Sequence, residues 1–560
     1  MLLPKPTAAA PRVLGRLLVS SGAISEIQLA TALHEQRQTR ERLGEILIRH
    51  GADPEQIARA LAAQLRLPYA EPPLRPEPAA LRLVSRTLAE RLCAVPLCVE
   101  EKSVQVALAD PLNLAAIDDL EFQTGRRVAT LVATAHSVTA ALKAYDAEAV
   151  GRLVQRLPTA ASRQEPDVDA LQRASEAPPI VALVEHLLQQ AVGLGASDVH
   201  VEPTEHGLHV RVRIDGILTS IAALPAEAAP AVVSRLKVLG GLDISVKRRP
   251  QDGRASLRVG ERTYALRVST LPAQTGEKVV LRILDPAAVV VPLEQLGLSD
   301  AGAASVLRMI GAPHGLLLVT GPTGSGKTTT LYAALGTIDR ARRNVITLED
   351  PVEYRLNGAT QVQVHRRAGL SFASALRAVL RQDPDVIMVG ELRDKETAEV
   401  ALAAAATGHL VLSTLHTNDA PGAIARLFHL GVQPFMVAAA LVGVIAQRLA
   451  RRLCGSCRGA GCGRCRQGYS GRTGIFEILE ITPPVRSLIA RRAPVAYLRD
   501  AARAAGFTSL GEDAWRVVQA GLTSEAEVRP LLQQLEAEFE RCPTCARPVR
   551  ESFGTCPQCG

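Results

Sequence analysis

Hydrophobic and polar positions change their spacing several times along the chain, and each change indicates a different module. Between residues 179 and 290, four stretches alternate apolar with polar residues, which predicts strands that each turn one face to a core. These stretches are Val199–Glu202, Leu208–Ile214, Thr263–Val268 and Lys278–Ile283. Because a helical pattern over 179–193 precedes them, the segment is predicted to form an α/β domain.

An internal repeat occupies the first segment of the chain. Leu14-Gly15, Gly22, Leu29, Leu33 and Gln36 recur, with one residue deleted, as Leu43-Gly44, Gly51, Ile57, Leu61 and Gln64. Each copy has the pattern of a short helix, a glycine stop and an amphipathic helix, so residues 10–70 are predicted to form a helical domain. Residues 71–145 mix strand-like and helical pieces and predict a second α/β module. Residues 146–178 are polar and lack a sustained period, so we expect a linker there.

A glycine-rich segment follows the apolar run Leu316–Val319 and precedes the helix-compatible Leu331–Leu335. This order of strand, glycine loop and helix is that of a P-loop, in which backbone N–H groups turn toward phosphate oxygens. Lys327 is expected to reach the β- and γ-phosphates of a nucleoside triphosphate, and the Thr328 hydroxyl to hold Mg²⁺. The expected nucleotide-binding residues are Gly321, Pro322, Thr323, Gly324, Ser325, Gly326, Lys327, Thr328 and Thr329.

Carboxylates after two further apolar runs indicate hydrolysis rather than binding alone. Glu349, Asp350 and Glu353 lie just after the run that begins at Ile346, where a carboxylate could polarise the attacking water. Glu391 ends the next apolar strand and is expected to reach the metal or its water. A solvated acidic turn is the alternative for the first group.

Two histidines, His409 and His416, lie on either side of a further apolar strand. They are expected to sense the γ-phosphate, because they follow the acidic strand in sequence. A packed structural histidine is the alternative for each of them.

Eight of the ten cysteines form two sets of four. Their spacing suits tetrahedral Zn²⁺, and thiols remain reduced in a cytoplasmic setting, so zinc is favoured over disulfides. The first set is Cys454, Cys457, Cys462 and Cys465, and the second is Cys542, Cys545, Cys556 and Cys559. Cys93 and Cys98 are expected to be core thiols.

Composition restricts the class of protein further. A length of 560 residues predicts several domains, and the net charge of +8 does not by itself indicate nucleic acid. Aromatic residues make up only 3% of the chain, which leaves little material for stacking bases. The longest apolar run, Phe435–Ala446, is well short of the roughly 18 residues that span a bilayer, and the start of the chain lacks a secretory signal pattern. We therefore expect a cytoplasmic protein that meets a membrane through partners.

The motifs resemble, in order and spacing, the assembly ATPases of type II secretion and type IV pilus systems. The resemblance covers residues 10–530 and rests on Ala196–Pro203, Arg211–Gly216, Arg249–Arg254, Arg267–Pro272, Gly321–Thr330, Glu349–Tyr354, Asp383–Asp394 and Thr407–Asn418. It implies a multidomain α/β protein whose RecA-like P-loop core (291–450) follows a PAS-like α/β domain (179–290). The expected C-terminal parts are a tetracysteine zinc element (451–475), a helical region (476–540) and a zinc-ribbon-like tail (541–560).

The same resemblance implies a homohexamer that acts on an inner-membrane platform protein and is recruited by a membrane-associated partner. Arg267 and Arg282 of the preceding domain would reach the phosphates, Glu353 would be the general base, and Glu391 would support Mg²⁺ or the attacking water. Further arginines, expected around the site or its interfaces, are Arg377, Arg381 and Arg393. A tetracysteine motif is typical of assembly rather than retraction motors. Two departures are the short spacer between its cysteine pairs and the second cysteine set, whose role the sequence leaves open.

The helical repeat also resembles the cyclic di-GMP-binding domain of some pilus ATPases. Arg42-Leu-Gly44 through Gln64 fits that pattern, whereas the first copy has Val13 in place of the arginine. A helical dock for a membrane-anchored partner is the alternative. For the whole chain, the alternatives are a non-hydrolysing ATP-binding scaffold and a nucleic-acid translocase related to conjugation ATPases. Nucleic acid is not an expected partner, and the sequence does not separate a pilus from a DNA-uptake filament or a secretion pseudopilus.

Overall fold

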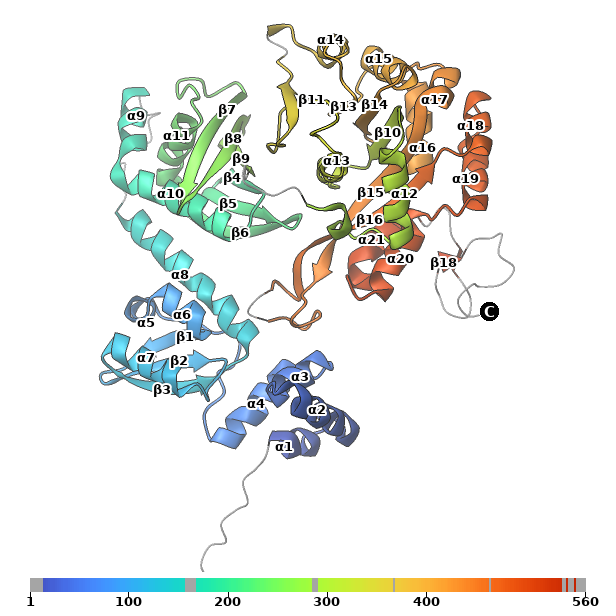
Figure 1. Cartoon of the computed structure of the whole chain (residues 1–560). Coiled ribbons are helices and arrows are strands. Elements are labelled where there is room, and N and C mark those ends of the chain that lie inside the picture. The colour runs from blue at the N-terminus through green and yellow to red at the C-terminus, as the bar shows by residue number, and fades with distance from the viewer. Residues whose placement is uncertain are drawn as a thin grey trace, which may run out of the picture. The chain divides into compact units, whose positions relative to one another are not determined.

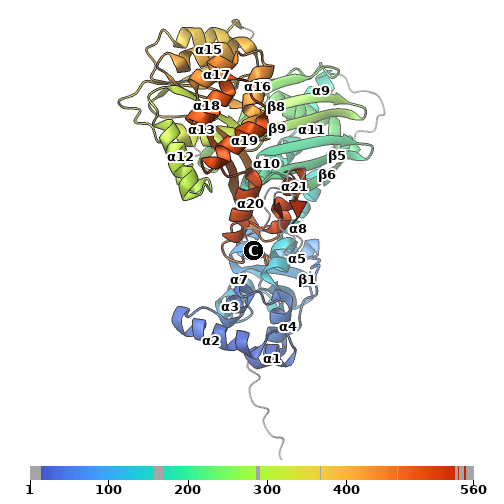
Figure 2. The same cartoon turned by 90° about the vertical axis from the view of Figure 1, so that its right-hand side faces the viewer.

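The computed structural model describes residues 14–156, 168–284, 291–365, 368–462, 465–535, 540–541 and 548–549. The chain divides into two compact units (Figures 1 and 2). The first consists of Met1–Leu284 with Leu453–Ser470, and the second of Asp285–Arg452 with Gly471–Gly560.

Four helices begin the first unit and confirm the repeat. They are α1 (Leu14–Ser20), α2 (Glu26–Thr39), α3 (Leu43–Arg49) and α4 (Pro54–Leu65). The repeated Leu-Gly pair has a packing reason, because a Cβ at Gly15 would lie 2.7 Å from the Leu29 side chain and one at Gly44 would lie 3.3 Å from Ile57. Each copy therefore needs a glycine where its short helix crosses its longer one.

A small α/β module follows, with a sheet in the order β1-β2-β3. Its elements are α5 (Pro78–Leu83), α6 (Arg86–Leu92), β1 (Ala94–Val99), β2 (Ser103–Leu108), α7 (Leu114–Thr124), β3 (Arg127–Val132) and α8 (Ala135–Gln155). The predicted linker over 146–178 is wrong in its described part, because α8 extends to Gln155 and α9 spans Val168–Glu176. Asp146 obscured the helical pattern, since this acid occupies the buried stripe between Val138 and Val150 and pairs with Arg86.

The last part of the first unit is a six-stranded antiparallel sheet in the order β6-β5-β4-β9-β8-β7. Its elements are α10 (Pro178–Gly193), β4 (Asp198–Thr204), β5 (Gly207–Ile214), β6 (Ile217–Pro225), α11 (Ala229–Leu239), β7 (Gln251–Val259), β8 (Arg262–Ala273) and β9 (Gly276–Leu284). All four stretches predicted from alternation are strands. Their buried residues, such as Val199, Leu266 and Leu281, share one core with apolar residues of α10 and α11.

The second unit is built on a seven-stranded sheet in the order β12-β11-β13-β14-β10-β15-β16. The first six strands in this order, from β12 to β15, are parallel to one another. The strands are β10 (Gly315–Thr320), β11 (Val345–Glu349), β12 (Ala359–Gln363), β13 (Val386–Val389), β14 (Leu410–Leu415), β15 (Leu441–Leu453) and β16 (Tyr469–Glu480). Because β16 belongs to this sheet, the core extends past the expected boundary at residue 450.

Helices enclose the sheet, and successive residues of β10 point into different cores. The helices of this unit are α12 (Asp300–Ile310), α13 (Lys327–Gly336), α14 (Phe372–Val379), α15 (Lys395–Ala406), α16 (Ala420–His429), α17 (Pro434–Ala440), α18 (Pro483–Ala490), α19 (Val495–Ala504), α20 (Leu510–Gln519) and α21 (Glu525–Leu535). Leu316 and Leu318 pack with residues of α14 to α20, whereas Leu317 and Val319 pack with residues of α12 and α13. The short strands β17 (Glu540–Arg541) and β18 (Pro548–Val549) pair near the C-terminus. Within the described residues, no helix has the length and apolar character to cross a bilayer.

Candidate active site

Four parallel strands bring most of the expected site residues to one edge of the sheet in the second unit. The register pairs Thr320 of β10 with Leu415 of β14, and Val389 of β13 with both Leu348 of β11 and Ser413 of β14. The carboxyl ends of these strands therefore lie side by side, which is where open α/β sheets bind ligands.

The P-loop connects β10 to α13 at this edge, and its glycines adopt conformations that other residues avoid. Gly321, Gly324 and Gly326 have φ angles of 151°, 80° and 88°. A Cβ at Gly321 would lie 2.5 Å from the backbone oxygen of Gln447, and one at Gly326 would lie 2.8 Å from the Gln447 amide nitrogen. The Gln447 side chain also accepts a 2.7 Å hydrogen bond from Thr330. Sequence analysis missed Gln447, which supports the P-loop from β15.

Two groups of the P-loop fit a bound polyphosphate. The Ser325 hydroxyl is buried and has no hydrogen-bond partner among the described residues, so it is available to a phosphate oxygen. The loop also leads directly into the N-terminus of α13, where helix N–H groups favour anions. Thr328 lies in the first turn of this helix.

Lys327 is folded back over the loop. Its Nζ donates to the carbonyl oxygens of Gly321 (2.9 Å) and Pro322 (3.0 Å). Burial lowers the pKa of Lys327, while the charge of Glu391 raises it and that of Arg448 lowers it. Burial disfavours the charged form of Lys327, and an anion bound in the loop would favour that form again.

The carboxylates after β11 are in different environments. Glu349 is 3% exposed and accepts hydrogen bonds from Tyr332 (2.6 Å), Thr347 (2.6 Å) and Gln361 (3.2 Å). This network makes Glu349 a structural residue of the sheet edge. Glu353 is half-buried on the loop that follows β11, next to Tyr354.

Tyr354 anchors the loop that carries Glu353. Its ring packs edge-on against Tyr332, with 5.7 Å between ring centroids, and its carbonyl oxygen accepts hydrogen bonds from Tyr332 (3.2 Å) and Gln361 (2.9 Å). Since Tyr332 belongs to α13, these contacts attach the loop to the helix that begins at the P-loop. Glu353 is thus half-buried on an anchored loop, whereas Asp350 at the start of that loop is exposed.

Glu391 and His416 come together after β13 and β14. The Glu391 carboxylate pairs with Arg393, and its other oxygen lies 4.0 Å from His416 Nε2. Burial lowers the pKa of His416, and the nearby Lys327 lowers it further. An acid and a neutral imidazole thus lie close to the lysine of the P-loop.

His409 is not part of this group. It directly precedes β14 and pairs through its backbone with Gly315 at the start of β10, so it lies at the opposite edge of the sheet from the P-loop. Its Nδ1 is 3.0 Å from the carbonyl oxygen of Ala404, which is the contact of a packed structural histidine. The expectation that His409 and His416 sense the phosphate of the same P-loop is therefore corrected: the intervening strand separates them.

The arginines Arg267 and Arg282 belong to the first unit, where they are directly paired across β8 and β9. Arg254 of β7, to which the sequence analysis gave no role, pairs with Arg267. Directly paired residues point to the same face, so the three arginines form a row opposite the hydrophobic core. Asp198 continues the row and accepts a 3.0 Å hydrogen bond from Arg282.

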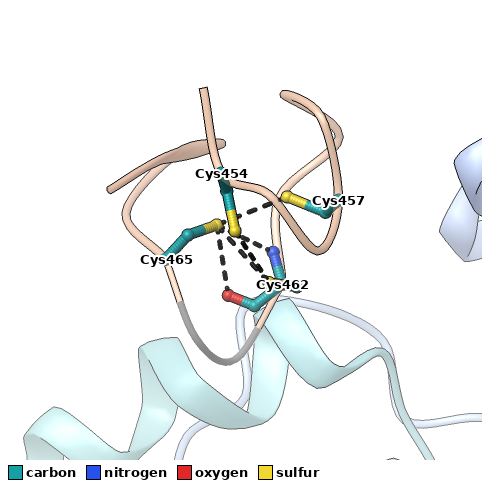
Figure 3. A group of neighbouring side chains, drawn as sticks. All are labelled: Cys454, Cys457, Cys462 and Cys465. Carbon is teal, nitrogen blue, oxygen red and sulfur yellow. Dashed lines mark hydrogen bonds between the residues drawn. The ribbon is translucent and has the colours of Figure 1, made fainter. Parts of the chain in front are cut away.

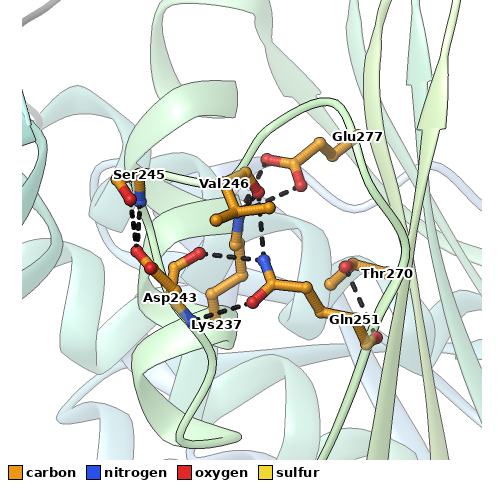
Figure 4. A network of polar contacts seen from close by, with 7 residues as sticks. All are labelled: Lys237, Asp243, Ser245, Val246, Gln251, Thr270 and Glu277. Atoms are coloured by element: carbon orange, nitrogen blue, oxygen red, sulfur yellow. Dashed lines mark hydrogen bonds and ion pairs between the residues drawn. The ribbon is translucent and has the colours of Figure 1, made fainter.

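A buried lysine fixes the segment that leads into this row (Figure 4). Lys237 is 1% exposed, and its Nζ donates to the Val246 carbonyl oxygen (2.7 Å) and to Glu277 (3.0 and 3.2 Å). Gln251 is the first residue of β7, and its side chain forms hydrogen bonds with the backbone of Asp243 and Val246. The loop from α11 to β7 is thus held at several points before the chain reaches Arg254.

The first cysteine set forms a compact cluster in the connection between β15 and β16 (Figure 3). The four Sγ atoms lie within 4.8 Å of one another, with separations of 3.5 Å for Cys457–Cys465, 3.6 Å for Cys462–Cys465 and 3.8 Å for Cys454–Cys462. Four thiolates at about 2.3 Å from one Zn²⁺ would lie about 3.8 Å apart, so the cluster fits a tetrahedral ion. Burial raises the pKa of Cys454, but N–H groups of Cys457 and Ser456 bring it to about 7. The second set, Cys542, Cys545, Cys556 and Cys559, lies outside the described residues.

Comparison with known proteins agrees with this arrangement. Residues 173–530 match the family model described as Type II/IV secretion system protein, and residues 65–152 match the MshEN domain. The chain is 40% identical to the type IV pilus assembly ATPase PilB of Myxococcus xanthus, over 92% of this chain and 98% of that protein. It is 46% identical to the type II secretion system protein HxcR of Pseudomonas aeruginosa, over 75% of this chain and 89% of that protein.

A solved structure adds evidence on the fold. The ATPase DotB of Legionella pneumophila aligns with a TM-score of 0.52 at 23% identity, covering 63% of this chain and 96% of that one. The P-loop edge, the match over most of the chain and the full-length relatives agree. This chain belongs to the type II/IV secretion system protein family and is an ATPase of the kind that serves type II secretion and type IV pilus assembly.

Proposed function

We propose that the chain is a cytoplasmic motor that hydrolyses ATP to drive the assembly of pilin or pseudopilin fibres through an inner-membrane platform protein. The observation that carries the proposal is that Lys327, Glu391 and His416 lie close together at the edge where the P-loop enters α13. Binding alone would need only the loop. A half-buried carboxylate on an anchored loop, together with an acid–imidazole pair, supports hydrolysis over the scaffold alternative.

Each residue at this edge has a role in the proposal. The P-loop from Gly321 to Thr329 would hold the phosphates of ATP, and Thr328 would hold Mg²⁺, which neutralises the charge that develops during phosphoryl transfer. Glu353 would accept the proton of the attacking water. Glu391 would orient Mg²⁺ or that water, and His416 would donate to the γ-phosphate.

The arginine row supports a ring in which subunits share their sites. We assign Arg267 and Arg282 to the phosphates bound by a neighbouring copy, because a planar guanidinium stabilises charge on the γ-phosphate. The homohexamer implied by the family would place such a row at every interface. A membrane-associated partner would recruit the ring to the platform protein.

Turnover and assembly can be tested together. ATPase activity of the purified protein is measured across a concentration series, with mass photometry on the same samples. We expect turnover to rise with the hexamer population and to vanish in Lys327→Ala. Assembled rings that bind ATP without turnover would support the scaffold, and stimulation by DNA or RNA would support the translocase.

The cysteine cluster is proposed to hold one structural Zn²⁺, since its sulfur separations match a tetrahedral site. The second cysteine set is proposed to hold another on the basis of its spacing.

Cyclic di-GMP is a second proposed ligand, and the helical repeat is its candidate site. The guanidinium of Arg42, which would meet a phosphate, is paired with Asp110. Binding would therefore exchange one anion for another at Arg42. Isothermal titration calorimetry with cyclic di-GMP tests this, and we expect Arg42→Ala to abolish the heat of binding. Unchanged binding in Arg42→Ala would rule out this site.

A further inference from the structure

A carboxylate far from the P-loop in sequence occupies the junction of two helices in the second unit. Glu477 of β16 is 5% exposed. One of its oxygens accepts the N–H of Ala420 at 2.7 Å, and the other accepts the N–H of Leu510 at 3.1 Å. These are the first residues of α16 and α20, so a single side chain satisfies N–H groups at two helix N-termini.

Helix α16 follows the loop His416–Asp419 directly. Asp419 is the N-cap of α16 and pairs with Arg499 of α19. Its carbonyl oxygen accepts a 2.9 Å hydrogen bond from the Thr417 hydroxyl, and the Thr417 N–H donates to Thr320 Oγ1 at 2.9 Å.

Because Thr320 is the last residue before the P-loop, a continuous set of contacts joins Glu477 to the nucleotide edge. Arg448 of β15 supports the same loop, since its guanidinium donates to the carbonyl oxygen of Asn418 at 2.8 Å. The loop that carries His416 is therefore held from the P-loop side and from the C-terminal helices.

We propose that Glu477 is a positioning residue for ATP hydrolysis: together with Arg499 it fixes the loop His416–Asp419, and it thereby links the C-terminal helices α19 and α20 to the catalytic edge. The proposal rests on the proposed role of His416. It assigns the C-terminal region a part in turnover that none of the sequence motifs indicated.

The protonation of Glu477 gives this role a distinctive readout. The charged groups around the carboxylate are Asp419 on α16, Arg499 on α19 and Arg448 on β15. Burial and the charge of Asp419 raise the pKa of Glu477, the two N–H donors and Arg499 lower it, and the net result is a pKa of about 7. Below this value a proton occupies one oxygen, and one helix N-terminus loses its acceptor. Turnover should therefore fall as the pH drops through 7.

The test compares Glu477→Gln with Asp513→Asn in the full-length protein. Asp513 is a matched control, because it is equally buried and accepts the N–H of the adjacent Phe476 at 2.8 Å, but its other oxygen binds Arg516 rather than the His416 loop. The measurements are kcat and KM for ATP between pH 6 and 8.5, and the melting temperature of each variant.

We expect Glu477→Gln to lower kcat at pH 8 by about 10-fold, since small displacements of a positioned group are costly. The KM for ATP should stay within about twofold, and the step in activity near pH 7 should disappear. Asp513→Asn should keep the wild-type kcat and pH profile even where its melting temperature falls.

A wild-type kcat and pH profile in Glu477→Gln, or an equal loss in Asp513→Asn, would overturn the proposal. If Glu477→Gln does not fold, Arg499→Lys takes its place and should lower kcat without changing KM. An absence of turnover that depends on Lys327 in the unmodified protein would instead refute the proposed function, so the two failures are distinguishable.

Discussion

The choice between Glu349 and Glu353 as the general base can be decided by replacing each with glutamine. The two residues belong to one acidic segment, and sequence alone gives both a plausible role. In the structure, Glu349 accepts three side-chain hydrogen bonds, whereas Glu353 lies half-buried on a loop anchored through Tyr354. We therefore expect Glu349→Gln to affect stability and Glu353→Gln to affect chemistry.

The size of the first effect follows from the contacts. A hydrogen bond to a charged group contributes about 1 kcal/mol more than one between neutral groups. Replacing the Glu349 carboxylate weakens three such bonds and turns an amide N–H₂ toward hydroxyl and amide donors. The expected loss is about 3 kcal/mol in the free energy of unfolding of the second unit.

The second effect concerns the transition state alone. Removal of a general base lowers kcat by about 100-fold to 10,000-fold. Glu353→Gln should lose activity on this scale and accumulate bound ATP, while Glu349→Gln should stay within about threefold of the wild-type kcat at temperatures where it is folded.

The assays are steady-state ATPase at saturating ATP and urea unfolding followed by fluorescence. The chain has one tryptophan, Trp515, and it lies on α20 of the second unit, so its emission reports on the unit that contains Glu349. A Glu349→Gln variant of normal stability that has lost hydrolysis as fully as Glu353→Gln would contradict the structural role of Glu349.

The zinc site, the arginine row and His416 can each be tested separately. Cys454→Ser should lose one zinc per chain in elemental analysis, whereas Cys93→Ser should keep the full content; equal zinc in both would contradict the tetrahedral site. Arg282→Ala and Lys327→Ala should each be inactive alone, but equal mixtures should regain up to about a quarter of wild-type turnover, because about one interface in four then pairs an intact lysine with a neighbour's intact arginine. An absence of recovery would contradict a role of Arg282 at a neighbour's phosphates. His416 should titrate below 6.5 by NMR, because burial and Lys327 disfavour its charged form. Its pKa is therefore lower in the folded than in the unfolded protein, so its contribution to stability is complete above pH 6.5 and is lost as the pH falls below that value.

Sequence patterns predicted the strands and the P-loop because both depend on local spacing. Alternation located the strands of the antiparallel sheet, and the glycine spacing located the loop and its helix. The linker prediction failed over α8 because one buried charge, Asp146, interrupts an otherwise regular apolar stripe. Its partner Arg86 lies 60 residues earlier, so no local pattern reveals the pair.

The supporting contacts of the site were missed for a similar reason. Gln447 packs against the P-loop from β15, and Glu477 reaches α16 from β16, but both residues follow the P-loop by more than a hundred residues. Only the strand order, with β15 beside β10, brings Gln447 to the loop. Sequence spacing predicts which residues carry the chemistry more readily than it predicts which ones hold them in place.

The positions of His409 and His416 could have been separated from the sequence alone. Both flank β14, which is a run of six buried residues. A strand rises about 3.3 Å per residue, so the backbones of His409 and His416 must lie roughly 20 Å apart, on opposite edges of the sheet. The same apolar run that predicted the strand therefore already excluded a joint role at one phosphate. Since the carboxyl ends of parallel strands meet at the P-loop edge, the residue after such a strand can reach a bound nucleotide, and the residue before it cannot reach the nucleotide of its own chain.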